Sequence, residues 1–286
     1  MWWIWLAVAA LLLAVHSAHA RDIALGTFPS NASEKVGKAL APLAEYLSEQ
    51  TGDNVRLIIS SDYDELLRRL EDGSVDLAWI GATGYVRARE MQPNLRYLAT
   101  YQEWEKTGKT AIPYYRSYIV TRKDSSLVDL ASMRGTRFAF TDKGSTSGYT
   151  YPVFMFSAQG IFPERYFGKM FFLRRQDKVV EALVAGSIDA GAMSDGAYEN
   201  GVRKYGDVFR ILFRSEEIPL DAIVASPNME EETSLRYQAA LTSLPKDSPV
   251  LLAISEHLGW PAAGFVVKND AFYDPLRRAL NYVELE

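Results

Sequence analysis

The chain has 286 residues, 48% of them apolar and none of them cysteine, and its formal net charge is −5. At about 100–200 residues per domain, this length indicates two lobes or domains. The lack of cysteine excludes disulfides, thiolate metal ligands and a cysteine nucleophile, and it also excludes a lipid-modified cysteine anchor. The acidic balance, with no dense run of Lys or Arg, argues against nucleic acid as a partner.

Residues 1–20 read MWWIWLAVAALLLAVHSAHA and contain no Lys, Arg, Asp or Glu. An apolar run over 2–15 is followed by Ala18-His19-Ala20, a small-x-small pattern that signal peptidase accepts. We expect a cleaved export signal, a mature chain that begins at Arg21, and a periplasmic protein with no stable membrane insertion. The alternative is an uncleaved anchor, although about 14 apolar residues are short for a span that needs ~20.

Beyond Arg21, short β-branched runs alternate with helical periodicity. In chain order, the first part is predicted to contain strands 22–25, 54–60, 75–80 and 95–101 and helices 33–49, 63–71 and 82–90. Ser33 is the expected N-cap of the first helix, and Gly52 lies just beyond its end. Strands that alternate with helices imply parallel pairing through right-handed crossovers.

The later part of the chain continues this pattern and then becomes helical. It is predicted to contain strands 114–121, 136–140 and 209–219, helices 230–244, 248–258 and 273–285, and a turn at 260–265.

An internal repeat relates two segments without a gap. LLRRLEDGSVDLAWIGATGYVRA at 66–88 resembles VVEALVAGSIDAGAMSDGAYENG at 179–201. Each copy indicates a helix, a Gly C-cap, a buried strand, a small-residue turn and a second helix. Asp76 and Asp189 are equivalent in the repeat and begin buried strands, so we expect both to be structural.

The repeat predicts two related α/β lobes. If the chain crosses near 114–121 and returns near 209–219, lobe two is 120–215. Lobe one is then 21–119, completed by a return strand and C-terminal helices within 216–286. Two crossings make a two-stranded hinge.

The stretch GSTSGY carries Ser145, Thr146 and Ser147 between strand 136–140 and a predicted helix. In a parallel α/β sheet, ligands lie beyond the carboxyl ends of strands, where helices present free N–H groups. Three hydroxyls could surround a small tetrahedral anion with donors that add no charge. The alternative is a simple helix cap, which contributes ~0.5–2 kcal/mol without any ligand. No Gly-Lys-Ser/Thr follows, so the stretch is not a nucleotide P-loop.

Histidine and tyrosine narrow the chemistry further. His257 is the only histidine outside the signal, which argues against Ser–His catalysis and excludes a multi-His metal site. We therefore predict no catalytic residue, no metal and no cofactor. Tyr63, Tyr85 and Tyr115 lie near strand ends, where a phenol can donate to an oxyanion.

The segment DKGSTSGYTYPVF resembles the Ser-Thr-Ser helix start of periplasmic phosphonate/phosphite/phosphate-binding proteins, the solute receptors of ABC importers. Three more blocks match this family in order: SDYDELLRRLEDGSVDLAWIGATGY, YYRSYIVTRKDS and GSIDAGAMSD. Together they cover most of 22–225, and the C-terminal segment matches only loosely.

The resemblance implies an α/β fold, a two-lobed type II periplasmic binding protein with a central cleft and a two-stranded hinge. It implies that the hydroxyls of Ser145, Thr146 and Ser147 hold a phosphonyl group. Tyr63 falls at the position of a cleft tyrosine of the family, and Tyr115 falls at the entry-strand position. Carboxylates that face an aminoalkyl tail in some members correspond to Asp195 and Asp221.

One departure concerns the residues before the second helix of lobe two. Where relatives often have His-Asp, this chain has Gln176-Asp177 after Arg174-Arg175. Gln176 therefore takes the histidine position. Either Arg174 or Arg175 could supply an anion donor in its place, or both could be solvated.

We therefore expect a non-enzymatic periplasmic protein that binds a small oxyanion (phosphonate, phosphite or phosphate) and delivers it to an ABC permease. One alternative keeps the fold but makes the chain the sensing partner of a membrane histidine kinase with a different small anion. A second alternative is an enzyme on the same scaffold, against which the missing cysteine and the single histidine argue.

Overall fold

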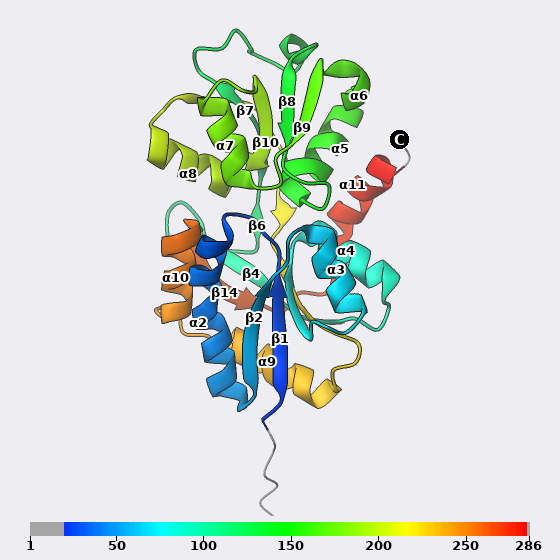
Figure 1. Ribbon diagram of the computed structural model, residues 1–286, viewed down its shortest axis with the longest axis vertical. Coiled ribbons are helices and arrows are strands. Elements are labelled where there is room, and N and C mark those ends of the chain that lie inside the picture. Colours follow the sequence, from blue (N-terminus) through cyan, green and yellow to red (C-terminus); the bar gives the residue numbers. More distant parts are fainter. Residues whose placement is uncertain (1–19, 285–286) are drawn as a thin grey trace, which may run out of the picture.

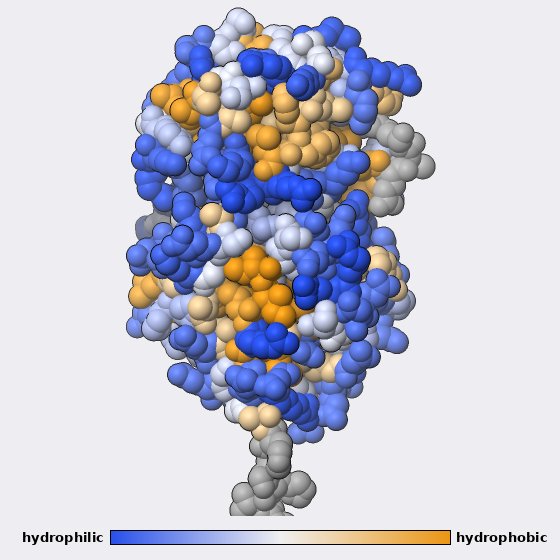
Figure 2. All heavy atoms as spheres, in the orientation of Figure 1, coloured by the Kyte–Doolittle hydropathy of each residue, from blue (hydrophilic) through white to orange (hydrophobic). Residues whose placement is uncertain are grey.

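The computed structural model describes residues 20–284, so all of the predicted export signal except Ala20 lies outside the described residues. Figure 1 shows two lobes stacked along the long axis, each built on its own β-sheet and flanked by helices. In Figure 2, hydrophilic residues dominate this face and extend along the junction of the lobes, while apolar surface forms a central patch on lobe one and several separate areas on lobe two. Within residues 20–284, no helix combines the length and apolar character that a membrane span requires.

Lobe one is built on a seven-stranded sheet in the order β14-β4-β13-β3-β1-β2, with β5 paired to β4. Its strands are β1 (Asp22–Thr27), β2 (Asn54–Ile59), β3 (Leu77–Ile80), β4 (Arg96–Trp104), β5 (Ala111–Ile112), β13 (Ala222–Ala225) and β14 (Ala262–Val266). Its helices are α2 (Ser33–Thr51), α3 (Tyr63–Glu71), α4 (Ala82–Met91), α9 (Glu231–Thr242), α10 (Pro249–Leu258), η3 (Asp270–Tyr273) and α11 (Asp274–Glu284).

Lobe two is built on a five-stranded sheet in the order β11-β7-β10-β8-β9. Its strands are β7 (Ser117–Arg122), β8 (Arg137–Phe140), β9 (Lys169–Phe172), β10 (Ala190–Ser194) and β11 (Phe209–Arg214). Its helices are η1 (Ala131–Met133), the π-helical turn η2 (Thr146–Thr150), α5 (Tyr151–Ser157), α6 (Pro163–Tyr166), α7 (Gln176–Val184) and α8 (Asp195–Tyr205).

The expectation of parallel pairing is wrong for part of each sheet, because an interior strand in each runs against its neighbours. β1 is parallel to β2 and β3, and β8 is parallel to β9 and β10, as predicted. However, β13 runs antiparallel to β3, and β7 runs antiparallel to β10. Both strands enter their sheet from the junction of the lobes, toward which the parallel strands point, and therefore run in the opposite direction.

Two short strands connect the lobes. β6 (Tyr114–Tyr115) and β12 (Ile218–Pro219) form an antiparallel pair in which Ile218 faces Tyr115. Each of the two long strands expected here, 114–121 and 209–219, is therefore divided into a connecting strand and a strand of lobe two. The result is a two-stranded connection between the sheets, as the sequence indicated.

Two local predictions in lobe one are wrong. The N-cap of α2 is Ala32, which has no side chain to accept a hydrogen bond, and Ser33 is already helical; Gly52, by contrast, caps the far end in the left-handed region, as expected. The turn predicted at 260–265 is instead largely strand β14. Its Gly264 has a φ of 125° and lies at a bulge against β4, so this glycine marks an irregular strand rather than a turn.

The internal repeat corresponds to α3-β3-α4 in lobe one and α7-β10-α8 in lobe two. Its two aspartates have the same role, because each accepts a backbone hydrogen bond from the neighbouring parallel strand. Asp76 Oδ2 accepts from Ala24 N at 2.8 Å, and Asp189 Oδ2 accepts from Arg137 N at 2.8 Å. This confirms the structural role expected for both residues.

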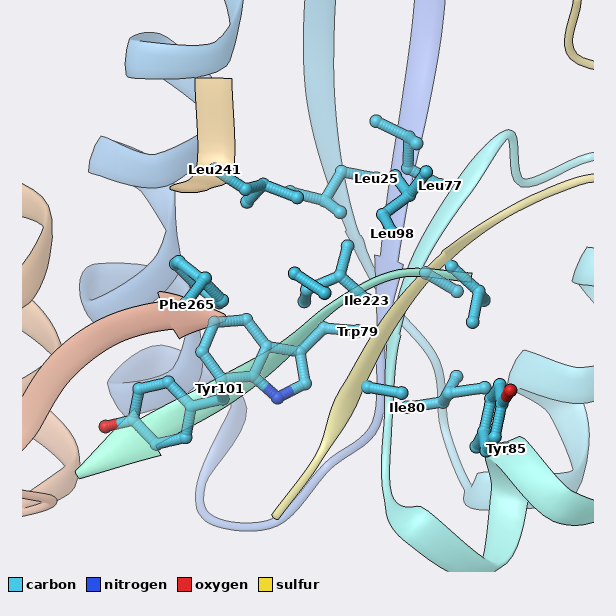
Figure 3. Packing of buried hydrophobic residues seen from close by; sticks show 14 of the residues in the cluster. Leu25, Leu77, Trp79, Ile80, Tyr85, Leu98, Tyr101, Ile223, Leu241 and Phe265 are labelled. Carbon is cyan, nitrogen blue, oxygen red and sulfur yellow. The ribbon is translucent and has the colours of Figure 1, made fainter. Parts of the chain in front are cut away.

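The core of lobe one surrounds Trp79, the third residue of β3, as Figure 3 shows. Its indole lies 5.0 Å from the ring of Tyr101 and 5.5 Å from the ring of Phe265, and it is almost fully buried. Buried aromatic rings of this size supply much of the hydrophobic stabilisation of a lobe.

The C-terminal helix α11 contacts both lobes. It packs against α4 of lobe one and α5 of lobe two, and the Tyr282 and Phe154 rings lie 5.4 Å apart. Figure 1 shows α11 beside the junction, between α4 and α5. The helix was expected to complete lobe one; in the structure it also links lobe one to lobe two through its contact with α5.

Candidate functional site

A small, partly open space lies between the lobes, at the carboxyl ends of the parallel strands. Its volume is about 60 Å³. Both lobes line it, with the following residues: Phe28, Ser30, Asn31, Tyr63, Gly81, Tyr101, Glu103, Tyr115, Ser145, Thr146, Ser147, Gln176, Ser194, Asp195, Gly196, Ala197, Asn200, Leu220, Asp221 and Trp260. We call this space the interlobe cavity.

Ser145, Thr146 and Ser147 form one wall of the interlobe cavity, and each is less than 5% exposed. The chain leaves β8 at Phe140, turns, and starts η2 with Ser145 as N-cap, whose Oγ accepts from Gly148 N at 3.1 Å. The simple capping explanation therefore applies to Ser145. Thr146 and Ser147 accept hydrogen bonds from other elements and are not needed as caps.

The lobes are closed around the cavity. From lobe one, Thr83 N at the start of α4 donates to Thr146 Oγ1 at 2.9 Å. On another side, Asn200 Nδ2 of α8 donates to the Leu258 carbonyl of α10 at 2.7 Å. Lys106 and Glu199 form a further ion pair across the junction at 3.0 Å. These contacts hold the two walls together at more than one edge.

Tyr63 and Tyr115 present neutral donors beside the three hydroxyls. Tyr63 begins α3 and stacks on Phe28, with ring centroids 4.8 Å apart. Burial and the nearby Asp221 carboxyl raise the pKa of both phenols. Each phenol therefore keeps its proton at neutral pH and can donate it to an anion.

Three carboxyl groups also line the cavity, and burial shifts each of them toward the neutral form. Burial raises the pKa of Asp221 to about 7, although Trp79 Nε1 donates to its Oδ2 at 2.9 Å. Burial raises the pKa of Asp195 to about 6, partly offset by backbone hydrogen bonds from Gly196 and Arg116. Burial, with Asp195 and Asp221 adding to it, holds the pKa of Glu103 well above its usual range.

The lining residues include no Lys or Arg among the residues that the structure describes. A bound anion would be held by hydroxyl, phenol and backbone N–H groups instead. Hydrogen bonds from such donors to a charged group are stronger than those between neutral groups, and burial lowers the local dielectric and strengthens them further. Within residues 20–284, no cluster of His, Asp and Glu side chains has the arrangement that holds a metal ion.

Gln176 lies at the cavity and links two parts of lobe two. It begins α7 and is 8% exposed. Its Nε2 donates to Ser147 Oγ at 3.2 Å, and its Oε1 accepts from Ser194 N at 3.0 Å. Of the ten candidate residues from the sequence, eight therefore lie at the cavity: Tyr63, Tyr115, Ser145, Thr146, Ser147, Gln176, Asp195 and Asp221.

The other two candidates, Tyr85 and Arg175, do not line the cavity. Tyr85 points into lobe one, where its Oη donates to Asp270 Oδ1 at 2.6 Å and its ring packs on Tyr273. Tyr85 does follow a strand end, but it lies on the face of α4 that packs on the core. The placement expected for it is wrong.

The Arg175 side chain binds Asp177, two residues along the chain, at 3.1 Å. Arg174 is largely exposed and lies 3.9 Å from Asp62. Neither guanidinium lines the cavity, so the expected role as an anion donor is wrong for both; Arg174 is solvated, whereas Arg175 is partly buried in its ion pair with Asp177.

Several lining residues were not predicted, notably Glu103 and Trp260. The strand expected at 95–101 ends three residues later, at Trp104, so Glu103 lies two positions after the buried Tyr101 and faces the same side. That alternation was a usable signal. Trp260 was not recognised as a lining residue because 260–265 was interpreted as a turn rather than as the start of a strand.

Comparison with known proteins identifies the family. A sequence model described as "ABC transporter, phosphonate, periplasmic substrate-binding protein" matches residues 25–273. The chain is 25% identical over 275 residues to the phosphate-import protein PhnD of Mycolicibacterium smegmatis, covering 89% of this chain and 84% of that protein. It is 24% identical over 200 residues to a probable ABC transporter phosphite binding protein, PhnD1, of Prochlorococcus marinus, covering 68% of this chain and 67% of that protein.

The fold agrees with these similarities. The structure of PhnD1 from Prochlorococcus marinus in complex with methylphosphonate has a TM-score of 0.81 to this chain at 19% sequence identity, covering 92% of this chain and 98% of that one. The expected type II periplasmic binding fold is thus confirmed. The chain is also 23% identical over 275 residues to the tetrathionate sensor histidine kinase TtrS of Salmonella typhimurium, covering 96% of this chain but 41% of the kinase.

Proposed function

The chain belongs to the family of periplasmic substrate-binding proteins of phosphonate ABC transporters, and we propose that it captures a small phosphorus oxyanion in the interlobe cavity. The ligand would be a phosphonate, phosphite or phosphate, delivered from the periplasm to an ABC permease. The observation that carries this proposal is the buried Ser145-Thr146-Ser147 wall, with the Tyr63 and Tyr115 phenols beside it. Neutral donors gathered around one cavity favour an oxyanion over a neutral solute.

The size of the cavity favours a compact ligand. A water molecule occupies about 10–15 Å³ on the same measure, so about 60 Å³ holds roughly four to six water-sized groups. Methylphosphonate, phosphite and phosphate are of this size. A longer alkyl tail would require the lobes to stay further apart.

The carboxyl groups support selection among oxyanions. Asp221 Oδ2 accepts a hydrogen bond from the Trp79 indole. The other carboxyl oxygen, Oδ1, lies near Gly81, and so does Thr146 Oγ1. A Cβ atom placed on Gly81 would be 3.8 Å from each of these two oxygens. Because the pKa of Asp221 is about 7, its carboxyl is ionised at pH values above 7, where it can accept a hydrogen bond from a ligand that carries a proton or an amino group. Sulfate is fully deprotonated at neutral pH and offers no such donor, so its charge would be repelled.

Calorimetric titration tests this proposal directly. Methylphosphonate, phosphite, phosphate and sulfate are each titrated into the protein under the same buffer conditions. We expect saturable binding of at least one phosphorus anion and much weaker binding of sulfate. Binding of sulfate alone would overturn the proposal.

We also propose that the protein does not catalyse a reaction. His257, the only histidine outside the predicted export signal, lies in the outer groove between α8 and α10 rather than at the interlobe cavity. A general base of the Ser–His type is therefore out of reach of the three hydroxyls. Turnover of methylphosphonate or phosphite by the purified protein would contradict this part of the proposal.

The similarity to TtrS supports a second candidate, in which the protein reports its ligand to a membrane histidine kinase. The gene neighbourhood discriminates between the two. Adjacent permease and ATPase genes support uptake, whereas an adjacent kinase gene supports sensing. In either case the predicted signal should be removed, and the mass of the mature protein should correspond to a chain that begins at Arg21.

A further inference from the structure

Each of the three hydroxyls in the cavity wall accepts an N–H group from the protein. Gly148 N donates to Ser145 Oγ at 3.1 Å, Thr83 N donates to Thr146 Oγ1 at 2.9 Å, and Gln176 Nε2 donates to Ser147 Oγ at 3.2 Å. A hydroxyl has one proton to give and two lone pairs to accept with. When an N–H group donates to a lone pair of the hydroxyl oxygen, the hydroxyl proton remains available to donate to another acceptor.

Two of these N–H groups belong to the backbone, and only Gln176 uses a side chain. An amide side chain could in principle present either its oxygen or its nitrogen to Ser147, because these atoms are nearly interchangeable in shape. Ser194 removes this freedom. Its backbone N–H can only donate, at 3.0 Å, so the amide oxygen of Gln176 must face Ser194 and the amide nitrogen must face Ser147.

The rest of the surroundings holds Ser147 in place and offers its proton one protein acceptor, the Tyr115 oxygen at the cavity. Ser117 Oγ donates to the Ser147 carbonyl at 2.6 Å, which fixes the backbone from the β7 side. On the cavity side, the Ser147 hydroxyl meets the Tyr115 phenol, with which it hydrogen-bonds. The Ser147 proton can therefore be directed only toward Tyr115 and the cavity.

We infer that Gln176 is a positioning residue that fixes Ser147 as a hydrogen-bond donor toward the cavity. Ser194 N–H donates to the amide oxygen of Gln176, and the amide nitrogen of Gln176 donates to the Ser147 hydroxyl oxygen. This inference rests on the proposed function, because donor polarity matters only if the ligand is an anion. It also assigns a role to the residue at which this chain departs from its relatives.

Two substitutions at Gln176 distinguish the effect of its hydrogen-bond donor and acceptor pattern from the effect of its side-chain shape. Gln176→Glu keeps the length of the side chain and the acceptor for Ser194, but a carboxylate must also accept from Ser147, which turns the Ser147 proton away from the cavity. Gln176→His offers one acceptor nitrogen and one donor nitrogen when the imidazole is neutral, so it preserves the direction of the bonds.

The test is calorimetric titration of wild type, Gln176→Glu and Gln176→His with methylphosphonate, phosphite and phosphate, above pH 7 so that imidazole is neutral. Because hydrogen bonds to charged groups are strong, we expect Gln176→Glu to lose about 100-fold in affinity and Gln176→His to stay within about 3-fold of wild type. Thermal unfolding of each variant checks that it is folded.

Added negative charge would also weaken anion binding, so the same pair of measurements is repeated in a Ser147→Ala background. There the Glu substitution has no hydroxyl to reorient. If Gln176 acts through Ser147, the loss of anion affinity that Gln176→Glu causes in this background should be below about 10-fold, as expected for coupled residues.

An equal loss in both backgrounds would overturn the inference and leave charge repulsion as the explanation, and so would unchanged affinity in Gln176→Glu. A Gln176→His variant that folds but loses affinity as strongly as Gln176→Glu would also contradict it. If wild type binds none of the three anions, the proposed function itself fails, which is a distinguishable result.

Discussion

Gly144 of lobe two lies directly against Tyr63 of lobe one: a Cβ atom on Gly144 would be 2.4 Å from Tyr63 Cβ. Atoms this close cannot be accommodated, and no rotamer change relieves the clash because the Tyr63 Cβ is fixed by its backbone. The glycine before Ser145 is therefore what allows the two lobes to close beside the three hydroxyls. Its φ lies outside the left-handed region, so an alanine would be tolerated in lobe two alone.

Gly144→Ala should block full closure and weaken ligand binding. We expect at least about a 10-fold loss of affinity for methylphosphonate or phosphite, because the donors of the two lobes can no longer reach the anion together. Calorimetry measures the affinity, and small-angle scattering measures whether the ligand still compacts the protein. The matched control is Gly37→Ala in α2, where the added Cβ meets only an ordinary contact at 3.7 Å. Equal affinity in the two variants would contradict this role of Gly144.

The three hydroxyls should separate into one cap and two ligand donors. Ser145→Ala removes the N-cap of η2 and should lower stability by about 1 kcal/mol. Thr146→Ala combined with Ser147→Ala removes two donors to a charged ligand and should cost about 3–6 kcal/mol of binding. Thr146→Ser, which keeps the hydroxyl, serves as the control. Unchanged affinity in the folded double variant would leave the wall without a binding role.

Asp221 should make the ligand-free protein less stable as the pH rises. Its pKa is raised from 3.8 in the unfolded chain to about 7 in the fold, so the stability linked to its proton is full below about pH 4 and is lost as pH rises through about 7. Asp221→Asn keeps an oxygen for the Trp79 indole but does not titrate. We expect its Tm to exceed that of wild type by about 3 °C or more at pH 8. This advantage should disappear toward pH 4, and a difference that does not change with pH would contradict the assignment.

Loss of the phenol oxygen should lower stability at Tyr85 and weaken anion binding at Tyr115. Tyr85→Phe breaks the hydrogen bond to Asp270 and should lower stability by about 1 kcal/mol without changing affinity. Tyr115→Phe removes a donor beside Thr146 and Ser147, and should weaken anion binding by about 10-fold or more. Weakened binding in Tyr85→Phe would show that the cavity reaches further into lobe one than the structure places it.

The position of the three hydroxyls at the interlobe cavity could be predicted because it depends on local sequence. The order strand, short turn, hydroxyl cap and helix is contained within about 20 residues, and a parallel strand directs such a turn toward the ligand side of the sheet. Ser145, Thr146 and Ser147 follow from this local pattern. The two lobes follow from the internal repeat, whose copies become α3-β3-α4 and α7-β10-α8.

The parts that could not be predicted depend on which face of an element meets the core. Tyr85 follows β3, but only packing against Tyr97 and Tyr273 shows that its ring turns away from the cavity. Arg175 is beside Gln176 in sequence, yet its guanidinium is held by Asp177. Glu103 reaches the site through β4, whose partners β13 and β14 come from more than 100 residues further along the chain.

The crystal structure of the protein with methylphosphonate tests the central claim most directly. Phosphonyl oxygens should lie within hydrogen-bonding distance of Thr146 Oγ1 and Ser147 Oγ, with the Tyr63 and Tyr115 phenols closing over them from the other side. A phosphonate bound elsewhere, or an interlobe cavity that holds only water beside those two hydroxyls at saturating ligand, would contradict it.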